Sequence, residues 1–177
     1  MKYKVAIPLA IILFTVISCG ALKHVTFYDD FHETVTVPQQ TLATGTNTIT
    51  TPNIPTNVST QLRQNNTSSD LVQSVRLETM TLTITAPQGQ NFSFLQDIQV
   101  FILTDSLPAV EVAHRSNIVS SSDTLNMDID GAELKPYLIS NSFKMKFITT
   151  NSKVTLTTTT LDVYLRFRFE ANLLAAL

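Results

Sequence analysis

The chain has 177 residues, a formal net charge of −2 and a sequence pI of about 5.8. No stretch combines clustered Lys and Arg with interleaved aromatic residues, which argues against a nucleic-acid partner. Cys19 is the only cysteine, so no disulfide within the chain can stabilise it, and packing with sheet hydrogen bonds has to hold the fold.

The first 18 residues have the order of a secretory signal peptide. Two lysines make a short basic start, a mostly apolar run follows at residues 5–16, and the small residue Ser18 precedes Cys19. The run is too short to cross a hydrocarbon core about 30 Å thick, which argues against a permanent transmembrane helix. An ordinary buried or paired thiol is the other alternative for Cys19, but there is no second cysteine to pair with it.

The stretch Val16-Ile17-Ser18-Cys19 resembles the lipobox of bacterial lipoproteins, and the resemblance covers residues 1–20 only. It implies that a diacylglyceryl group is joined to the Cys19 sulfur, that the leader is cut off and that the new amino terminus is acylated. We therefore expect a leader at 1–18, a lipidated tether at 19–23 and a single domain at 24–177. Several acyl chains would make this membrane attachment effectively permanent.

The residues after Cys19 indicate in which membrane the lipoprotein is expected to reside. In well-studied Gram-negative bacteria an Asp at the next position favours the inner membrane, and this chain has Gly20 there. Residues 20–23 also lack the acidic cluster that directs some lipoproteins to the cell surface. The resemblance thus implies the outer membrane, with a periplasm-facing domain slightly favoured over surface display. The short tether predicts a partner close to the bilayer.

Removal of the leader, with Lys2 and Lys4, leaves ten basic and 14 acidic residues, a net charge of −4. The remaining chain has 25 threonines but only four glycines. Threonine is branched at Cβ and favours extended backbone, and the apolar residues between the threonines favour strands over a polar stalk.

The first half of this domain begins with an alternating strand at 24–37, which Pro38 ends. The polar stretch 39–56 is expected to run along a sheet edge with a short strand at 48–51, and 57–64 is predicted as a short helix or another edge strand. A strong strand follows at 71–85, where the apolar phase changes near Glu78-Thr79 and indicates a bulge. Residues 98–104 are predicted as a central strand.

The second half continues with a shorter strand at 109–114 and an alternating one at 125–130. Residues 132–139 are predicted as a helical segment with Leu134, Tyr137 and Leu138 on one face, and Pro136 argues against it unless it falls within the first turn. An alternating strand at 143–147 is expected to turn at 151–153 into a long strand at 154–169.

These elements predict an all-β fold, an antiparallel, broadly immunoglobulin-like β-sandwich of about seven or eight strands with one or two short helical segments. A partly closed barrel is the alternative. The cysteine pair and the tryptophan that mark true immunoglobulin domains are absent from the sequence.

One string resembles half of a calcium loop. Asn126, Asp128 and Asp130 offer oxygen atoms at alternate positions before Gly131, but the twelfth position is Tyr137 and not the bidentate Glu that closes such a loop. The three residues are explained more simply as the solvent-exposed face of a strand. We therefore expect no metal and no cofactor, with this trio as the weak candidate.

The histidines suggest no catalytic centre. His24, His32 and His114 have no metal-ligand spacing among them, and no nucleophile motif or phosphate-binding glycine loop is present. A tight cluster of His24, His32 and Asp29 around an open cleft would revive an enzyme hypothesis, but the sequence favours a protein that is not an enzyme.

Ser106 and Thr124 lie in Asp-Ser-Leu and Asp-Thr-Leu triplets, which resemble an O-glycosylation motif used on exported proteins by some Gram-negative phyla. Turn chemistry alone also explains an Asp-Ser pair. The two hydroxyls are therefore candidate modification sites.

The sequence supports a membrane-anchored module that binds an envelope protein or a glycan, or has a structural role. The threonine-rich segments 41–60 and 155–160 are its expected contact surfaces. The alternative is a carrier with an apolar cavity between the sheets for a small hydrophobic ligand. Such a cavity requires at least about 300 Å³.

Overall fold

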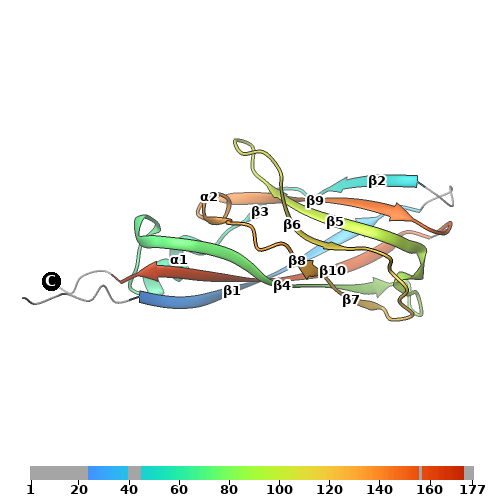
Figure 1. The fold of residues 1–177 in the computed structure, drawn as a ribbon, viewed down its shortest axis with the longest axis horizontal. Helices are drawn as coiled ribbons and strands as arrows, with labels where there is room; N and C mark the ends of the chain where they lie inside the picture. The colour runs from blue at the N-terminus through green and yellow to red at the C-terminus, as the bar shows by residue number, and fades with distance from the viewer. Residues whose placement is uncertain (1–23, 40–44, 156, 174–177) are drawn as a thin grey trace, which may run out of the picture.

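Two antiparallel sheets packed face to face make up the protein (Figure 1). The computed structural model describes residues 24–39, 45–155 and 157–173. The fold is thus the all-β antiparallel sandwich that the sequence predicts, built from ten strands and two short α-helices.

The first sheet has four strands in the order β1-β10-β4-β7. Their bounds are β1 His24–Val37, β10 Thr159–Asn172, β4 Val72–Ala86 and β7 Thr124–Asn126. The second sheet has the order β2-β9-β5-β6-β8, and β3 pairs with β9. Its bounds are β2 Gly45–Thr50, β3 Ile54–Pro55, β9 Ser142–Asn151, β5 Leu95–Leu103, β6 Val110–Arg115 and β8 Asp128–Ile129.

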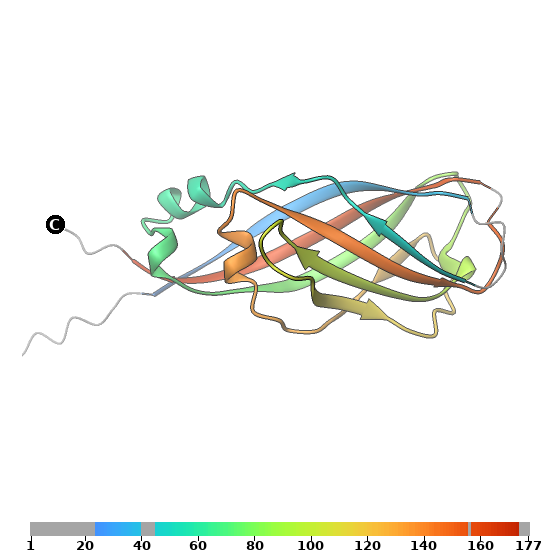
Figure 2. The same cartoon turned by 90° about the horizontal axis from the view of Figure 1, so that it is seen from above.

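Without the two-residue strands, the order β1-β10-β4-β7 faces β2-β9-β5-β6, which is the arrangement of a double Greek-key jelly roll. The chain repeatedly crosses from one sheet to the other, as Figure 2 shows from above. The predicted strand at 125–130 is divided in this way. β7 belongs to the first sheet and β8 to the second, with the buried Met127 between them.

Short helices lie in the connections between strands, α1 between β3 and β4 and α2 between β8 and β9. α1 spans Val58–Gln64 and α2 spans Lys135–Leu138, with Pro136 in its first turn. Single 3-10 turns lie at Ser69–Leu71 and Phe92–Phe94. Within the described residues, no helix is long and apolar enough to cross a membrane.

The predicted strands at 24–37 and 71–85 are confirmed as β1 and β4, and so is the bulge near Glu78, where β4 has one residue more than β10. The predicted hairpin at 151–153 is wrong. β9 and β10 lie in different sheets, and β10 begins only at Thr159. The alternation of apolar and polar residues predicts which face of a strand points inward, but it does not predict which strand pairs with it.

Phenylalanines fill the centre of the sandwich. Phe167 is fully buried, and its ring meets the edges of Phe31 and Phe143 at centroid distances of 5.5 and 6.2 Å. Nearer the chain ends of the first sheet, Phe27 stacks on Phe169 at 4.9 Å. One space between the sheets, bordered by Val35, Phe147 and other mostly apolar side chains, measures about 10 Å³.

Truncation of Phe167 tests this packing. We expect Phe167→Ala to lower the free energy of unfolding by about 3–5 kcal/mol, because it removes a buried ring and leaves a cavity. Tyr28→Ala is the matched control, since that ring is 49% exposed and its removal should cost less than about 1 kcal/mol. Urea unfolding monitored by circular dichroism measures both. Equal losses would contradict the assignment of Phe167 to the core.

Candidate functional site

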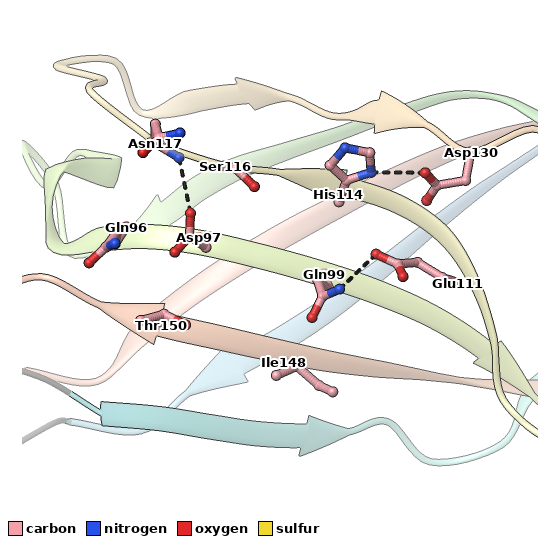
Figure 3. A pocket seen from close by; sticks show the side chains of 10 residues that line it. All are labelled: Gln96, Asp97, Gln99, Glu111, His114, Ser116, Asn117, Asp130, Ile148 and Thr150. Atoms are coloured by element: carbon pink, nitrogen blue, oxygen red, sulfur yellow. Dashed lines mark hydrogen bonds and ion pairs between the residues drawn. The ribbon is translucent and has the colours of Figure 1, made fainter.

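A polar groove of about 700 Å³ lies on the outer face of the second sheet, over β5, β6 and the end of β9 (Figure 3). All but one of its lining residues are polar. They are Gln96, Asp97, Gln99, Glu111, His114, Ser116, Asn117, Asp130, Ile148 and Thr150. Most of them stand on strands, so their positions are set by the sheet register and not by loop conformation.

A bulge in β6 determines which of its side chains reach the groove. Ala113 pairs with Val100 and Glu111 pairs with Phe101, so Val112 is an extra residue in β6. In a regular strand Glu111 and His114 would point to opposite faces. The extra residue shifts the phase, and both side chains point outward.

Hydrogen bonds fix the groove side chains in pairs. The Gln99 Nε2 donates to Glu111 Oε1 over 2.9 Å, and His114 Nδ1 lies 2.9 Å from Asp130 Oδ1. At the far end of the groove, the Asp97 carboxylate accepts the backbone N–H of Asn117 at 3.0 Å. Asn117 has φ +54°, a conformation that Asn tolerates better than most residues.

Asp130 is held where the chain leaves β8. Its N–H donates to the Val112 carbonyl at 3.0 Å, and Gly131 follows with φ +71°. A residue with a Cβ is strained at that φ, which explains the glycine. Asp130 therefore reaches the groove from the end of a strand followed by a sharp turn.

The side chain of Glu133, three residues after Asp130, forms hydrogen bonds with the first sheet. Its carboxylate accepts hydrogen bonds from the Val75 N–H at 2.9 Å, the Ser74 hydroxyl at 2.7 Å and the Lys135 N–H at 3.0 Å. Partial burial alone would raise the pKa of Glu133, but these hydrogen bonds outweigh it and lower the pKa below its ordinary value.

A second polar cluster covers the outer face of β1 and β10, but its groups already satisfy one another. Asp30 accepts two hydrogen bonds from Arg166, at 2.8 and 3.0 Å, and one from Tyr164 at 3.2 Å. The hydrogen bond from Arg166 is the main reason that the pKa of Asp30 is lowered. His32 pairs with Asp162 at 3.2 Å. These are cross-strand contacts of a solvated sheet face.

Asp29 is the buried acid of β1. It is 8% exposed, and its Oδ2 has no hydrogen-bond partner among the described residues. Burial raises the pKa of Asp29, and the adjacent charge of Asp30 raises it further. Asp29 is not among the residues that line the polar groove over β5 and β6.

The structure separates the calcium candidates. Asn126 accepts a hydrogen bond from the Thr81 hydroxyl in the first sheet, whereas Asp128 pairs with Arg115 at 3.0 Å and Asp130 with His114 in the second. All three are exposed, as expected for the wet face of a strand.

The histidine cluster that would revive an enzyme hypothesis is not formed. Asp29 points inward on β1 and His32 points outward. His24 is eight residues from His32 on the same extended strand, roughly 26 Å away. His114 is instead in the groove.

Ser106 and Thr124 are both exposed, as a modified hydroxyl has to be. Ser106 lies in the turn after β5, and Thr124 begins β7. Their glycosylation stays a prediction. Cys19, with the leader at 1–18 and the tether at 19–23, lies outside the described residues.

Sequence reasoning missed Gln99 and Glu111 as groove residues. Each has an equally good explanation as a surface residue of a strand. The available signal was the adjacent apolar pair Val112-Ala113 between Glu111 and His114, which breaks the alternation where the bulge occurs.

No family model and no curated protein matches this chain. Among solved structures it is similar to the BFDV capsid protein in its 60-mer form, at 10% identity over 88% of this chain and 96% of that chain, with a TM-score of 0.46. It is also similar to desmodium yellow mottle tymovirus (11% identity, 85% and 91% covered, TM-score 0.30). A third similarity is to cocksfoot mottle virus (10% identity, 99% and 98% covered, TM-score 0.28). These TM-scores carry no argument, and the fold assignment rests on the strand order above.

Removal of the Glu133 carboxylate tests the hydrogen bonds that it accepts from Ser74 and Val75 of the first sheet. We expect Glu133→Ala to lower the free energy of unfolding by about 1 kcal/mol at pH 7, a small value because the group is half exposed and water replaces part of the lost bonding. The pKa of Glu133 is lower in the folded than in the unfolded protein, so its stabilisation is complete above its ordinary pKa of 4.5 and disappears as the pH falls through the folded pKa.

The difference between Glu133→Ala and the wild type should therefore shrink in acid. Urea midpoints measured from pH 7 down to pH 3 check this. A difference that stays constant, or grows, at low pH would contradict the role given to the carboxylate.

Proposed function

We propose that this protein is an envelope lipoprotein, held in the outer membrane by acyl chains on Cys19, whose β-sandwich binds an oligosaccharide in the polar groove over β5, β6 and β9. The proposal includes no catalytic step. The observation that carries it is the chemistry of the groove lining.

The groove presents side-chain amides, carboxylates and hydroxyls in fixed positions on strands. Side-chain amides both donate and accept hydrogen bonds, and carboxylates accept them through two oxygens, which suits the vicinal hydroxyls of a sugar. A protein partner would instead be expected to seat an aromatic or aliphatic anchor in an apolar pocket. Ile148 is the only apolar residue of the lining. These features favour a glycan over a protein.

The interior supports the same choice against the carrier alternative. An enclosed space of about 10 Å³ is far too small for a lipid or another hydrophobic ligand, which needs at least about 300 Å³. The buried phenylalanines are accounted for by their contacts with one another. Binding is therefore assigned to the outside of the sandwich.

The first described strand begins at one end of the sandwich, and the groove lies toward the other end. His24, at the start of β1, pairs with Asn172, at the end of β10. Gly45 and Leu95 both pair with Asn151, near the groove, at the opposite end (Figure 1). β1 has 14 residues, a length of about 45 Å. A ligand in the groove would therefore lie farther from the bilayer than the short tether alone predicts.

The anchor is tested by Cys19→Ser. We expect this variant to incorporate no radiolabelled fatty acid and to keep its leader, because the sulfur that accepts the diacylglyceryl group is gone. Ser18→Ala is the control, since it keeps a small residue before the cut and should be labelled and cut normally. Labelling of Cys19→Ser at the wild-type level would contradict the proposed anchor.

Glycan binding is tested on the full-length chain in detergent micelles. We expect it to bind a subset of a panel of bacterial and host oligosaccharides, and Gln99→Ala to bind that subset about fivefold more weakly, the equivalent of one hydrogen bond of about 1 kcal/mol. Gln73→Ala is the matched control, because Gln73 is an exposed glutamine on β4 outside the groove. An absence of binding across the panel, or equal weakening by both variants, would refute the proposal.

A further inference from the structure

We propose that Glu111, His114 and Asp130 form a binding site for a divalent transition-metal cation, with Zn²⁺ as the representative ion. The site lies inside the polar groove, but its existence does not depend on the groove taking a glycan.

The three side chains have the geometry of a partly assembled site. Each offers one ligand atom, an imidazole nitrogen of His114 or a carboxylate oxygen of Glu111 or Asp130, and these atoms lie within 4.8 Å of one another. Ligand atoms around a tetrahedral Zn²⁺ at about 2.0–2.2 Å are roughly 3.4 Å apart. Small side-chain rotations therefore suffice to close the site around an ion.

The ligand set selects the class of metal. One imidazole with two carboxylates mixes a borderline ligand with hard ones, which suits Zn²⁺ and its first-row neighbours better than Ca²⁺, for which all-oxygen sites are typical. Three protein ligands leave a fourth position open. Asp130 is exposed, and all three side chains line the groove.

The backbone around Val112 positions all three side chains. The extra residue Val112 turns Glu111 and His114 to the same face, and the same Val112 carbonyl accepts the N–H of Asp130. One bulge thus positions all three ligands. Bulges are common beside functional sites, where they re-aim side chains.

The surroundings complete the site. The Gln99 amide holds Glu111 from the side at 2.9 Å, as outer-shell groups do at metal centres. Asp128 contributes no free charge because Arg115 pairs with it at 3.0 Å. The nearest charges to the ion are then the two ligating carboxylates, which balance a dication.

A second histidine-carboxylate pair in the chain provides a built-in comparison. His32 and Asp162 are 3.2 Å apart on β1 and β10. Among the residues that the structure describes, only Glu111, His114 and Asp130 meet the three-ligand geometry. A histidine beside an aspartate is thus present twice, but with a third ligand only once.

The experiment is titration calorimetry with ZnCl₂ on the full-length chain in detergent micelles. All samples carry Cys19→Ser, which removes the one thiol that could bind Zn²⁺ independently. We expect one ion per chain. His114→Ala, Glu111→Gln and Asp130→Asn should each weaken binding at least about tenfold, whereas His32→Ala should change it less than twofold. Unfolding midpoints in EDTA show whether each variant is folded.

Cobalt substitution gives an independent readout. Co²⁺ in a four- or five-coordinate site should give visible absorption bands that ZnCl₂ displaces and that are absent in His114→Ala. The proposal is overturned if the Cys19→Ser parent, with the groove residues unchanged, shows neither Zn²⁺ heat nor a Zn²⁺-dependent rise in the melting temperature. It is equally overturned if folded His114→Ala binds Zn²⁺ as tightly as that parent.

Discussion

The structure depends on one constraint: each long strand must turn one continuous apolar face toward the opposite sheet. β9 and β10 obey it almost residue by residue, with fully buried side chains such as Phe143 and Phe167 alternating with partly exposed ones. The burial of these faces supplies the main driving force for folding. With Cys19 the only cysteine, no disulfide assists it.

That constraint also determines where function can lie. The space between the sheets that Val35 and Phe147 border measures about 10 Å³, too small for a ligand, whereas the polar groove lies on an outer face. The two outer faces differ. On the first sheet, Asp30, Arg166 and Tyr164 satisfy one another. On the second, the paired polar side chains border a groove open to a ligand.

Two of the bulges show how departures from alternation affect the side chains of a strand. In β4, the extra residue near Glu78 changes the apolar phase along a strand whose inward residues stay buried at both ends. In β6, the extra Val112 keeps apolar side chains inside and brings Glu111 and His114 to one outer face. The same local device serves packing in one strand and a candidate site in the other.

The sequence was sufficient for the elements and their inward faces, because alternation is a local property. The strand at 24–37 and the bulge near Glu78 follow from local patterns. The helical segment expected at 132–139 is shorter in the structure, where α2 begins only at Lys135 and so places Pro136 in the first turn. The strand order was not readable, because alternation does not identify the neighbour across the sheet. For the same reason the sequence predicts a hairpin between β9 and β10, which lie in different sheets.

The candidate site was even less accessible to sequence reasoning. Asp130 was noticed with Asn126 and Asp128, its neighbours along the chain, but its structural partners are His114 and Glu111 on another strand. To predict a site whose residues lie on different strands, one has to know which residues of those strands are paired. Here one also has to know that β6 contains a bulge, because the bulge shifts the pairing. Only the paired apolar residues Val112-Ala113 hinted at it.

The central claim is that ligands bind on the outer face of β5 and β6 and not between the sheets. The most direct test is a map of backbone amide chemical shifts on addition of oligosaccharides released from the native envelope by mild acid. We expect the amide chemical shifts of Gln96, Gln99, Glu111 and His114 to change and those of Val35 and Phe147 to stay the same. Shifts centred on those core amides, or an unperturbed groove, would contradict it.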